Sequence, residues 1–348
     1  MKILVAPLNW GLGHASRCIP LIQRMLDEGH EIILGGDGES LTLLRKHFPT
    51  LRYVYLAPLN LRYSKGSRQV WAMIKTLPKL IAWSFKDHAM LAAVLREEPI
   101  DRVISDNRFG LYNRHTECIY MTHQLHIMLP KGWRWAESLA ARLHARIYAR
   151  FNKVWIPDCK EIEKSLAGKL SHRKADVEFI GPLSRFEMSR YRDIEISKSY
   201  DVVAVLSGLE PQRTMLEKEV VTRYTGKEER VLIVQGLMNR PNVRIKRSNI
   251  TIVPYLSDAE LVPALLGAKR IIARSGYSSI MDFDALGVLD KTELIPTPGQ
   301  PEQEYLATWI AQKSLFCKKN CIKICIYQKK AVLLHAFSSN GAKRGAIV

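Results

Sequence analysis

The sequence predicts an α/β protein with two domains, each built around a mostly parallel sheet. The chain has 348 residues and is 47% hydrophobic, which is long and apolar enough for two cores. Short apolar runs of strand length alternate with segments of helical length, an order typical of parallel sheets covered on both faces. The alternation breaks at Gly181-Pro182, a polar stretch follows to Tyr200, and the pattern then starts again.

The first half opens with a strand, a glycine-containing turn and a helix. We expect helices at residues 15–28 and 40–47, and a long, largely helical region between the third and fourth strands. The expected strands of this half are residues 2–7, 31–34, 52–56, 102–105, 118–121, 154–156 and 177–180.

The second half repeats the alternation and ends in an unusual tail. Its expected strands are residues 201–207, 230–235, 249–254, 270–274 and 293–296. We therefore expect a first domain over residues 1–182 and a second over residues 183–312. The remaining residues, 313–348, are basic, contain no acidic residue, and hold Cys317, Cys321 and Cys325. This tail is set apart from the core function.

The composition indicates the cellular compartment of the protein and the chemical class of its partners. A net charge of +18 favours anionic partners, such as a phosphorylated substrate or an anionic membrane surface. The six cysteines include no C-x-x-C pair, as expected for reduced thiols of a cytoplasmic protein. We find no apolar run of the roughly 20 residues that a membrane helix needs and no signal peptide. No nucleic-acid-binding motif accompanies the charge, so nucleic acid is not an expected partner.

The loop after the first strand carries the main candidate catalytic residue. Gly11 and Gly13 allow a tight turn that an acceptor can approach, and His14 falls at the start of the next helix. A helix N-terminus lowers the pKa of a histidine and favours neutral imidazole, the form that a general base needs. In open α/β sheets this strand end lies at the ligand crevice. A helix-capping histidine without chemistry is the alternative.

Two other strand ends of the first half carry polar residues. Asp106 follows the strand at 102–105, and His123 follows the strand at 118–121. Both should face the same crevice, where they could position an acceptor hydroxyl or simply cap neighbouring helices.

The most informative stretch follows the strand at 270–274. A strand that stops at Ser-Gly and turns directly into a helix points free backbone N–H groups outward, which is a phosphate-binding arrangement. A carboxylate about two turns into that helix can accept from ribose hydroxyls, and polar side chains after the next strand can contact the sugar. Together these features suggest a site for a nucleotide sugar, the donor of a sugar group. The candidate contacts to this donor are Ser275, Gly276, Tyr277, Ser278, Asp282, Gln300, Glu302 and Gln303.

Two further sites could hold the phosphates of a donor. Ser207 and Gly208 end the first strand of the second half and can offer a hydroxyl and a backbone donor. Arg213 follows them and can balance phosphate charge, and Arg185 can reach the same group from the linker. A plain strand–helix turn is the alternative for Ser207 and Gly208.

Asp282 and Asp284 have the Asp-x-Asp spacing that holds a metal in many sugar-transferring enzymes. On a helix, residues two apart point roughly 200° from each other, so only one of the two can face a ligand. We therefore expect no metal, and no other cofactor.

One segment of the first half is amphipathic. An apolar residue recurs every four positions and is bordered by arginines, with two tryptophans before it, which suits an anionic membrane surface. A core helix with a basic edge fits equally well, and residues 65–86, with Trp71 and Trp83, give similar support. The segment contains Trp133, Trp135, Leu139, Arg142, Leu143, Arg146, Ile147, Arg150 and Phe151.

In their order and spacing, these motifs resemble the MurG-type GT-B glycosyltransferases, namely the peptidoglycan N-acetylglucosaminyltransferases and their plant galactolipid-synthase relatives. Gly11-Leu12-Gly13-His14 resembles their Gly-rich loop ending in histidine, and Thr122-His123-Gln124 their acceptor-side segment. Residues 181–185 resemble their hinge with a phosphate-contacting arginine. Residues 275–282 and 300–303 resemble their uridine, ribose and sugar contacts, with aspartate in place of the family's glutamate. The resemblance covers residues 1 to about 313.

The resemblance implies two Rossmann-like domains facing across a cleft, the GT-B architecture. It implies inverting, metal-independent transfer of a hexose, with N-acetylglucosamine as one option, from a UDP-sugar. His14 and Asp106 would be the catalytic residues, and the acceptor, unidentified here, could be lipid-linked at the inner membrane face. A UDP-sugar 2-epimerase, or a degenerate binder of nucleotide sugar or membrane, remains an alternative.

Overall fold

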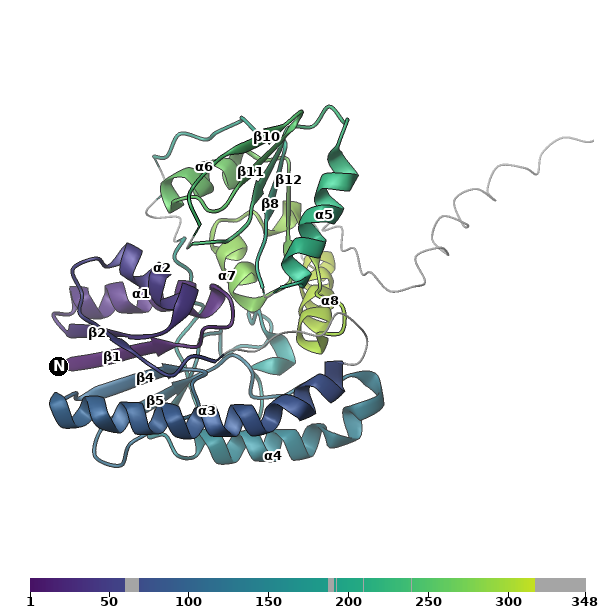
Figure 1. Ribbon diagram of the computed structural model, residues 1–348. Coiled ribbons are helices and arrows are strands. Elements are labelled where there is room, and N and C mark those ends of the chain that lie inside the picture. Colours follow the sequence, from purple (N-terminus) through teal and green to yellow (C-terminus); the bar gives the residue numbers. More distant parts are fainter. Residues whose placement is uncertain (60–68, 187–190, 192, 209, 239, 317–348) are drawn as a thin grey trace, which may run out of the picture.

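The computed structural model describes residues 1–59, 69–186, 191, 193–208, 210–238 and 240–316. The three cysteines of the tail, Cys317, Cys321 and Cys325, lie outside these residues, as do residues 65–68 of the second amphipathic segment. The described chain folds into two lobes, each with its own sheet (Figure 1).

The sheet of the first lobe has seven strands in the order β3-β2-β1-β4-β5-β6-β7, and all its pairings are parallel. The strand order reverses at β1, because β2 and β3 lie on one side of it and β4 to β7 on the other. The strands are β1 (Lys2–Pro7), β2 (Glu31–Gly36), β3 (Tyr53–Tyr55), β4 (Arg102–Asp106), β5 (Glu117–Met121), β6 (Lys153–Ile156) and β7 (Glu178–Phe179).

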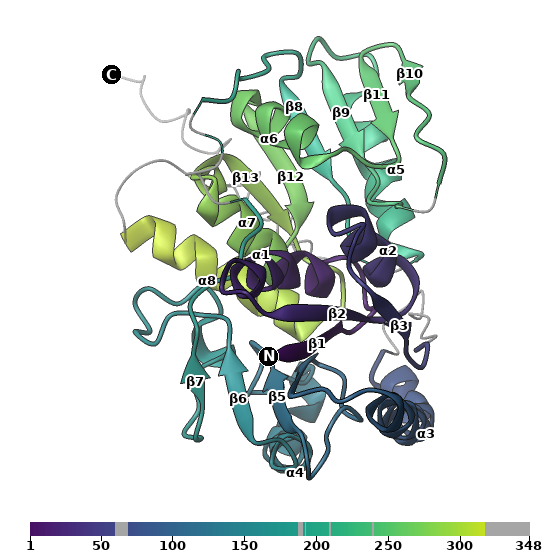
Figure 2. The same cartoon turned by 90° about the vertical axis from the view of Figure 1, so that its left-hand side faces the viewer.

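Helices cover both faces of this sheet. Helices α1 (Gly13–Asp27) and α2 (Gly38–His47) lie on the face toward the second lobe, while α3 (Gln69–Glu97) and α4 (Glu137–Tyr148) lie on the opposite face (Figures 1 and 2). Side chains alternate along β1, so that Ile3 packs with the α1 and α2 residues and Leu4 with the core on the α3 side.

The second lobe has six strands in the order β10-β11-β9-β8-β12-β13. Helix α5 (Gln212–Tyr224) packs on one face, and α6 (Asp258–Gly267) and α7 (Tyr277–Ala285) on the other. The strands are β8 (Val202–Val205), β9 (Val231–Val234), β10 (Ile245–Arg247), β11 (Ile250–Val253), β12 (Arg270–Arg274) and β13 (Thr292–Ile295).

The sequence analysis missed only one of these strands, β10. It is an exposed antiparallel strand at the edge of the sheet, and its residues Lys246 and Arg247 are charged. Charged residues are common on edge strands because they discourage pairing with other chains. They also remove the apolar run by which a buried strand is recognised.

The lobes contact each other through helix α8 (Pro301–Phe316), which follows the second sheet and lies against the first lobe (Figure 2). At the 3₁₀ helix η2 (Gly168–Leu170) of the first lobe, Leu170 shares a buried cluster with Leu306 and Ile310 of α8. The helix continues past the expected boundary at residue 312. The predicted fold class, two α/β units with largely parallel sheets, is confirmed.

Candidate active site

The strand orders fix where ligands can bind. In an open α/β sheet, the ligand crevice lies at the carboxyl ends of the two strands between which the order reverses. These strands are β1 and β4 in the first lobe, and β8 and β12 in the second. The loops after them face each other across the cleft: Ser278 Oγ donates to the carbonyl of Gly13 at 2.9 Å. A Cβ at Gly13 would lie 2.8 Å from that hydroxyl, so the close approach requires glycine.

His14 and Asp106 meet at the first of these strand ends. Pro7 of β1 pairs with Asp106 of β4, and the tight turn at Gly11 (φ +82°) returns the chain so that His14 lies in the first turn of α1. His14 Nδ1 lies 3.0 Å from Asp106 Oδ1. The His14 side chain keeps 16% of its exposure, whereas that of Asp106 is wholly buried. Asp106 is therefore closed to a ligand in the cleft, and only His14 of the pair retains accessible surface.

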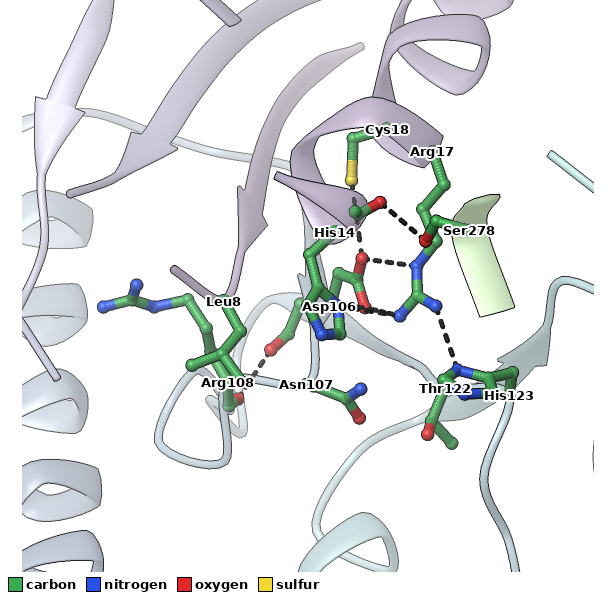
Figure 3. Close-up of polar contacts among 12 residues, drawn as sticks. Leu8, His14, Arg17, Cys18, Asp106, Asn107, Arg108, Thr122, His123 and Ser278 are labelled. Carbon is green, nitrogen blue, oxygen red and sulfur yellow. Dashed lines mark hydrogen bonds and ion pairs between the residues drawn. The ribbon is translucent and has the colours of Figure 1, made fainter. Parts of the chain in front are cut away.

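Arg17 completes the cluster, and the sequence analysis did not identify it. Its Nε donates to Asp106 Oδ2 at 2.7 Å, and its Nη2 donates to Oδ1 of the same carboxylate. Its Nη1 lies 3.0 Å from His123 Nδ1, so the guanidinium bridges the ends of β4 and β5 (Figure 3). Arg17 lies one helical turn after His14, and this spacing is the signal that could have revealed it.

The charges in this cluster set the protonation states of its members. Burial lowers the pKa of His14; Asp106 opposes that shift, and Arg17 adds to it, so the imidazole is favoured in its neutral form. Burial by itself would raise the pKa of Asp106, but the Arg17 guanidinium and His14 hold that pKa well below its usual range. The result is an ionised carboxylate beside a neutral imidazole, the arrangement of a proton-accepting pair.

His123 occupies a different place from the one expected. Its Nδ1 faces Arg17, its Nε2 lies 2.8 Å from Glu302 Oε1 on α8, and its ring stacks on Tyr277 with centroids 4.3 Å apart. Because both ring nitrogens are engaged, His123 has no free nitrogen for an acceptor hydroxyl. The expectation that His123 binds the acceptor directly is corrected to a contact between the lobes.

The start of α7 has an uncapped backbone, but the side chains around it are engaged in the protein. Gly276 is the N-cap residue and leaves the first-turn N–H groups unobstructed by a cap side chain. The side chains on either side are occupied: Ser275 Oγ donates to the carbonyl of Gln303, and the Tyr277 hydroxyl donates to the carbonyl of Pro157. Donor contact by the Ser275 and Tyr277 side chains is therefore corrected, because both point into protein contacts.

Asp282 lies at the joint of the two lobes. Ser184 Oγ donates to its Oδ1 at 2.7 Å, and Ser16 Oγ of the first lobe lies 3.4 Å from its Oδ2. Burial raises the pKa of Asp282 to about 6, against the opposing effect of Arg185. Asp284, two residues on, is exposed on the other side of α7, as the helical spacing predicted.

A cleft of about 280 Å³ opens between the lobes beside Asp282. Four predicted donor residues line it, and they come from the linker, β8 and α7. It is also lined by residues that the sequence analysis did not identify, from α2 and from the segment after β11. The predicted residues are Arg185, Ser207, Ser278 and Asp282, and the others include Lys46, His47, Tyr255, Ser257 and Asp258.

Other predicted donor residues are held by neighbours. Arg213 forms an ion pair with Glu210 at 2.5 Å, so the prediction that Arg213 neutralises phosphate would require that pair to open. Arg185 forms an ion pair with Asp258 at 3.1 Å at the edge of the cleft.

The turn after β13 is held in a similar way. Gln303 Oε1 accepts from the Thr297 N–H, and the Gln300 N–H donates to the carbonyl of Thr297. These bonds shape the turn that would face the sugar. Gly208, with φ at +92°, lies next to Gly11 across the cleft.

Within the described residues, no helix combines the length and the apolar character of a membrane span. The same residues contain no group of three or more His, Cys, Asp and Glu side chains placed to hold a metal ion.

Sequence comparison finds relatives among archaeal proteins. No family model matches the chain. An uncharacterised glycosyltransferase of Methanosarcina acetivorans is 30% identical over 331 residues, which cover 88% of this chain and 81% of that protein. Another from Methanosarcina mazei is 23% identical over 346 residues, covering 90% and 84%.

Solved structures with a similar fold are also glycosyltransferases. The spinosyn rhamnosyltransferase SpnG superposes with a TM-score of 0.56 at 13% identity over 89% of this chain and 84% of its own. It has been solved with thymidine diphosphate and with the spinosyn aglycone. SnogD from Streptomyces nogalater superposes with a TM-score of 0.52 at 16% identity, over 89% and 84%. With the GT-B fold of these enzymes and the sequence of the Methanosarcina proteins, the chain belongs to the glycosyltransferase family.

Proposed function

We propose that this glycosyltransferase is of the MurG type and moves a hexose, with N-acetylglucosamine as an option, from a UDP-sugar to an acceptor hydroxyl. The single observation that carries the proposal is the His14–Asp106 pair at the switch point of one sheet, opposite the start of α7 at the switch point of the other. In this proposal residues 1–182 form the acceptor side and residues 183–312 the donor side.

The cluster suits inverting transfer. Asp106 holds the Nδ1 edge of His14, so Nε2 is the nitrogen that can take the acceptor's proton. As the acceptor oxygen bonds to the anomeric carbon, the bond from that carbon to the diphosphate oxygen breaks, and UDP leaves on the opposite side. The proton ends on His14 and the electron pair on UDP.

The leaving diphosphate needs positive charge, and protein groups can supply it without a metal ion. The N-terminus of α7 offers backbone N–H groups and the positive end of its dipole. Arg185 lies at the edge of the cleft, where it could exchange Asp258 for phosphate. Asp282 would then accept from the ribose hydroxyls in place of Ser16 and Ser184. That the fold neighbour SpnG holds a nucleoside diphosphate supports this type of donor.

The test is a panel of UDP-, TDP- and GDP-sugars, read first by thermal shift and then by release of the nucleoside diphosphate. We expect one UDP-sugar to stabilise the protein, Asp282→Ala to abolish that stabilisation, and His14→Ala to abolish acceptor-dependent release while leaving the thermal shift intact. His30→Ala, at a partly buried histidine that does not line the cleft, is the matched control. Interconversion of two UDP-sugars would favour the 2-epimerase, and stabilisation without turnover a degenerate binder.

We also propose that the protein works at an anionic membrane surface and that its acceptor is lipid-linked. On α3, three large apolar side chains at a spacing of four residues are exposed: Leu77, Ile81 and Phe85, the last by 66%. They form one face of the helix because residues four apart project from the same side. Trp83 of the same helix is instead buried, with its indole donating to the carbonyl of Ala57.

Helix α4 adds a second apolar face. Leu139 and Leu143 are 54% and 48% exposed, and Trp135 just before the helix is 76% exposed. The helix packs on the core through Ala141 and His144, and Phe151 at the end of the apolar stripe is also buried, so only the first part of the stripe is available to a membrane surface. Both helices lie on the side of the first sheet away from the second lobe (Figures 1 and 2).

The charges beside these faces support anionic lipid as the proposed occupant. Lys79 and Lys86 on α3, and Arg142 and Arg146 on α4, are exposed and would meet acidic headgroups while the apolar side chains enter the interface. We expect the protein to sediment with phosphatidylglycerol vesicles and much less with phosphatidylcholine vesicles.

Matched variants distinguish vesicle binding through this surface from nonspecific binding through any exposed apolar side chain. Phe85→Ser combined with Leu139→Ser should release the protein from the vesicles, whereas Met215→Ser should not. Met215 is 49% exposed on α5 of the other lobe and serves as the control. A concentration-dependent dimer in ultracentrifugation that both serine changes abolish, with no vesicle binding, would instead identify these faces as a contact between copies of the chain.

A further inference from the structure

Arg17 is the buried cation of the candidate site, and the proposed reaction does not by itself assign it a role. Its side chain is 1% exposed, and it touches Asp106, His14 and His123 (Figure 3). These three residues follow β4, β1 and β5, so Arg17 is the group that joins the three central strand ends.

The contact with His123 fixes a proton. A guanidinium has five N–H donors and no acceptor, so the nitrogen that faces Arg17 Nη1 at 3.0 Å must present a lone pair. The proton of neutral His123 is then on Nε2, where it donates to Glu302 Oε1 at 2.8 Å. Burial raises the pKa of Glu302, but the His123 hydrogen bond and the charges around the carboxyl together lower that pKa below its usual value, so the carboxyl is ionised and accepts. Arg17 therefore reaches α8 through His123.

The position of a second proton, that of His14, depends on two opposing contacts. Arg17 binds both oxygens of Asp106, and His14 Nδ1 lies 3.0 Å from one of them. An ionised oxygen can only accept, so it favours a proton on Nδ1 and a lone pair on Nε2. The same Nη2 lies 2.9 Å from His14 Nδ1. In the competing arrangement Nδ1 accepts from Arg17, the proton is on Nε2, and His14 cannot receive a proton from an acceptor there.

We propose that Arg17 is a positioning residue: by binding both oxygens of Asp106 it keeps that carboxylate as the acceptor for a proton on His14 Nδ1, and through Nη1 it keeps the proton of His123 on Nε2, so that it joins the proton-accepting pair to Glu302. The proposal rests on the proposed function, because only there does the His14 lone pair have a use. It predicts that His14 is ready to accept a proton when helix α8, which carries Glu302, is packed on the first lobe.

The surroundings of His14 determine the sign of the effect of removing Arg17. The charged or titratable groups that act on it are Asp106 on β4, Arg17 on α1, His123 after β5 and Glu302 on α8, while Cys18 on α1 contacts Asp106. Without the Arg17 cation, His14 loses a repulsive charge and keeps Asp106 as an unshared partner. Both changes raise the pKa of His14.

The first test needs no substrate. In protein labelled with ¹⁵N-histidine at pH 8, two-bond correlation spectra distinguish the imidazole tautomers, and His14→Gln and His123→Gln assign the two signals. We expect the Nδ1–H form for His14 and the Nε2–H form for His123. A His14 signal of the Nε2–H form, or a His123 signal of the Nδ1–H form, would overturn the proposal.

The second test uses Arg17→Met, with Arg24→Met on the exposed face of the same helix as the control. We expect the pKa of His14 to rise by one unit or more in Arg17→Met and to stay unchanged in Arg24→Met. If Arg17→Met does not fold, Arg17→Lys keeps the charge but loses the fork, and His123 should then become a mixture of tautomers. Wild-type tautomers and titration in a folded Arg17 variant would contradict the proposal.

These outcomes are separable from those of the proposed function. The expected tautomers in a protein that transfers no sugar would leave the positioning role and remove the transferase. Sugar transfer with His14 in the other tautomer would leave the transferase and remove the positioning role.

Discussion

Arg17 and Arg108 are the two largest fully buried side chains in the described part of the chain, and both lie in the first lobe beside buried carboxylates. Arg108 donates to both oxygens of Asp87 at 3.0 and 2.7 Å, to Asp37 at 2.9 Å and to the carbonyl of Ala57 at 2.8 Å. It joins α3 to the segments after β2 and β3.

The difference between the two arginines lies in their partners. Every hydrogen-bond partner of Arg108 just named is a carboxylate or a carbonyl, which only accept, and the contacts tie elements together. Arg17 has one carboxylate and two imidazoles, and the imidazoles can gain or lose a proton near neutral pH. A buried ion pair therefore indicates chemistry when its partners titrate and reach a cleft, and indicates architecture when they do not.

The largest expected effect comes from exchanging one carboxylate of each cluster for its amide. Asp106→Asn removes the charge that orients His14, and we expect kcat to fall by on the order of 10²–10⁴, the usual contribution of a general base. Asp87→Asn should leave kcat of the folded fraction near wild type, because Asp87 faces Arg108 and not the cleft. Release of the nucleoside diphosphate at saturating donor measures both. Equal losses of kcat in the two variants would remove the distinction.

The second effect concerns stability. Arg108→Met leaves Asp87 and Asp37 without their cation in a buried site, and we expect unfolding in urea to lose about 3–5 kcal/mol. Arg24→Met, on the surface of α1, should change stability by less than about 0.5 kcal/mol. A loss below about 1 kcal/mol for Arg108→Met would mean that water or a neighbouring side chain replaces the guanidinium.

The sequence was informative where periodicity and strand ends determine position. The parallel strands were recognisable as short apolar runs, and their carboxyl ends brought His14 and Asp106 together, as register dictates. Asp282 was placed on the cleft side of α7 and Asp284 away from it, because residues two apart on a helix diverge.

The rest depended on contacts between distant segments. Arg17 resembles a residue on the polar face of α1 until Asp106, 89 residues away, supplies its partner. Tyr277 follows a Ser-Gly turn and was expected to contact a donor, but its ring is held by His123 across the lobes. The cleft residues Lys46 and Tyr255 face one another only because α2 lies over the end of β11. No local pattern encodes these encounters.

A third buried charge, Asp282, extends the comparison to the second lobe, because its pKa moves in the opposite direction to that of Asp106. With a folded pKa of about 6 and an unfolded pKa of about 3.9, the folded protein binds more protons between these values, so stability falls as pH rises through this window. Asp282→Asn should therefore stabilise the ligand-free protein at pH 7.5 by about 3 kcal/mol, with the gain disappearing toward pH 4. Asp290→Asn, at an exposed site, is the control. A lower melting temperature of Asp282→Asn at pH 7.5 would contradict this.

The smallest expected effect concerns the pH dependence of kcat, which should change with variants of the Arg17 cluster and not with variants of the Arg108 cluster. The pKa of His14 is lowered by burial, so the imidazole becomes protonated, and kcat at saturating donor falls, only below pH 6.5. Asp106 stays ionised throughout this range because its pKa is lower still. Asp87→Asn should leave this acid limb where it is, whereas Arg17→Lys should move it upward if the fork and not the charge alone depresses the His14 pKa. Profiles of kcat against pH from 5 to 8 measure the limb, and a wild-type midpoint at pH 7 or above would show that Asp106 and not burial dominates at His14.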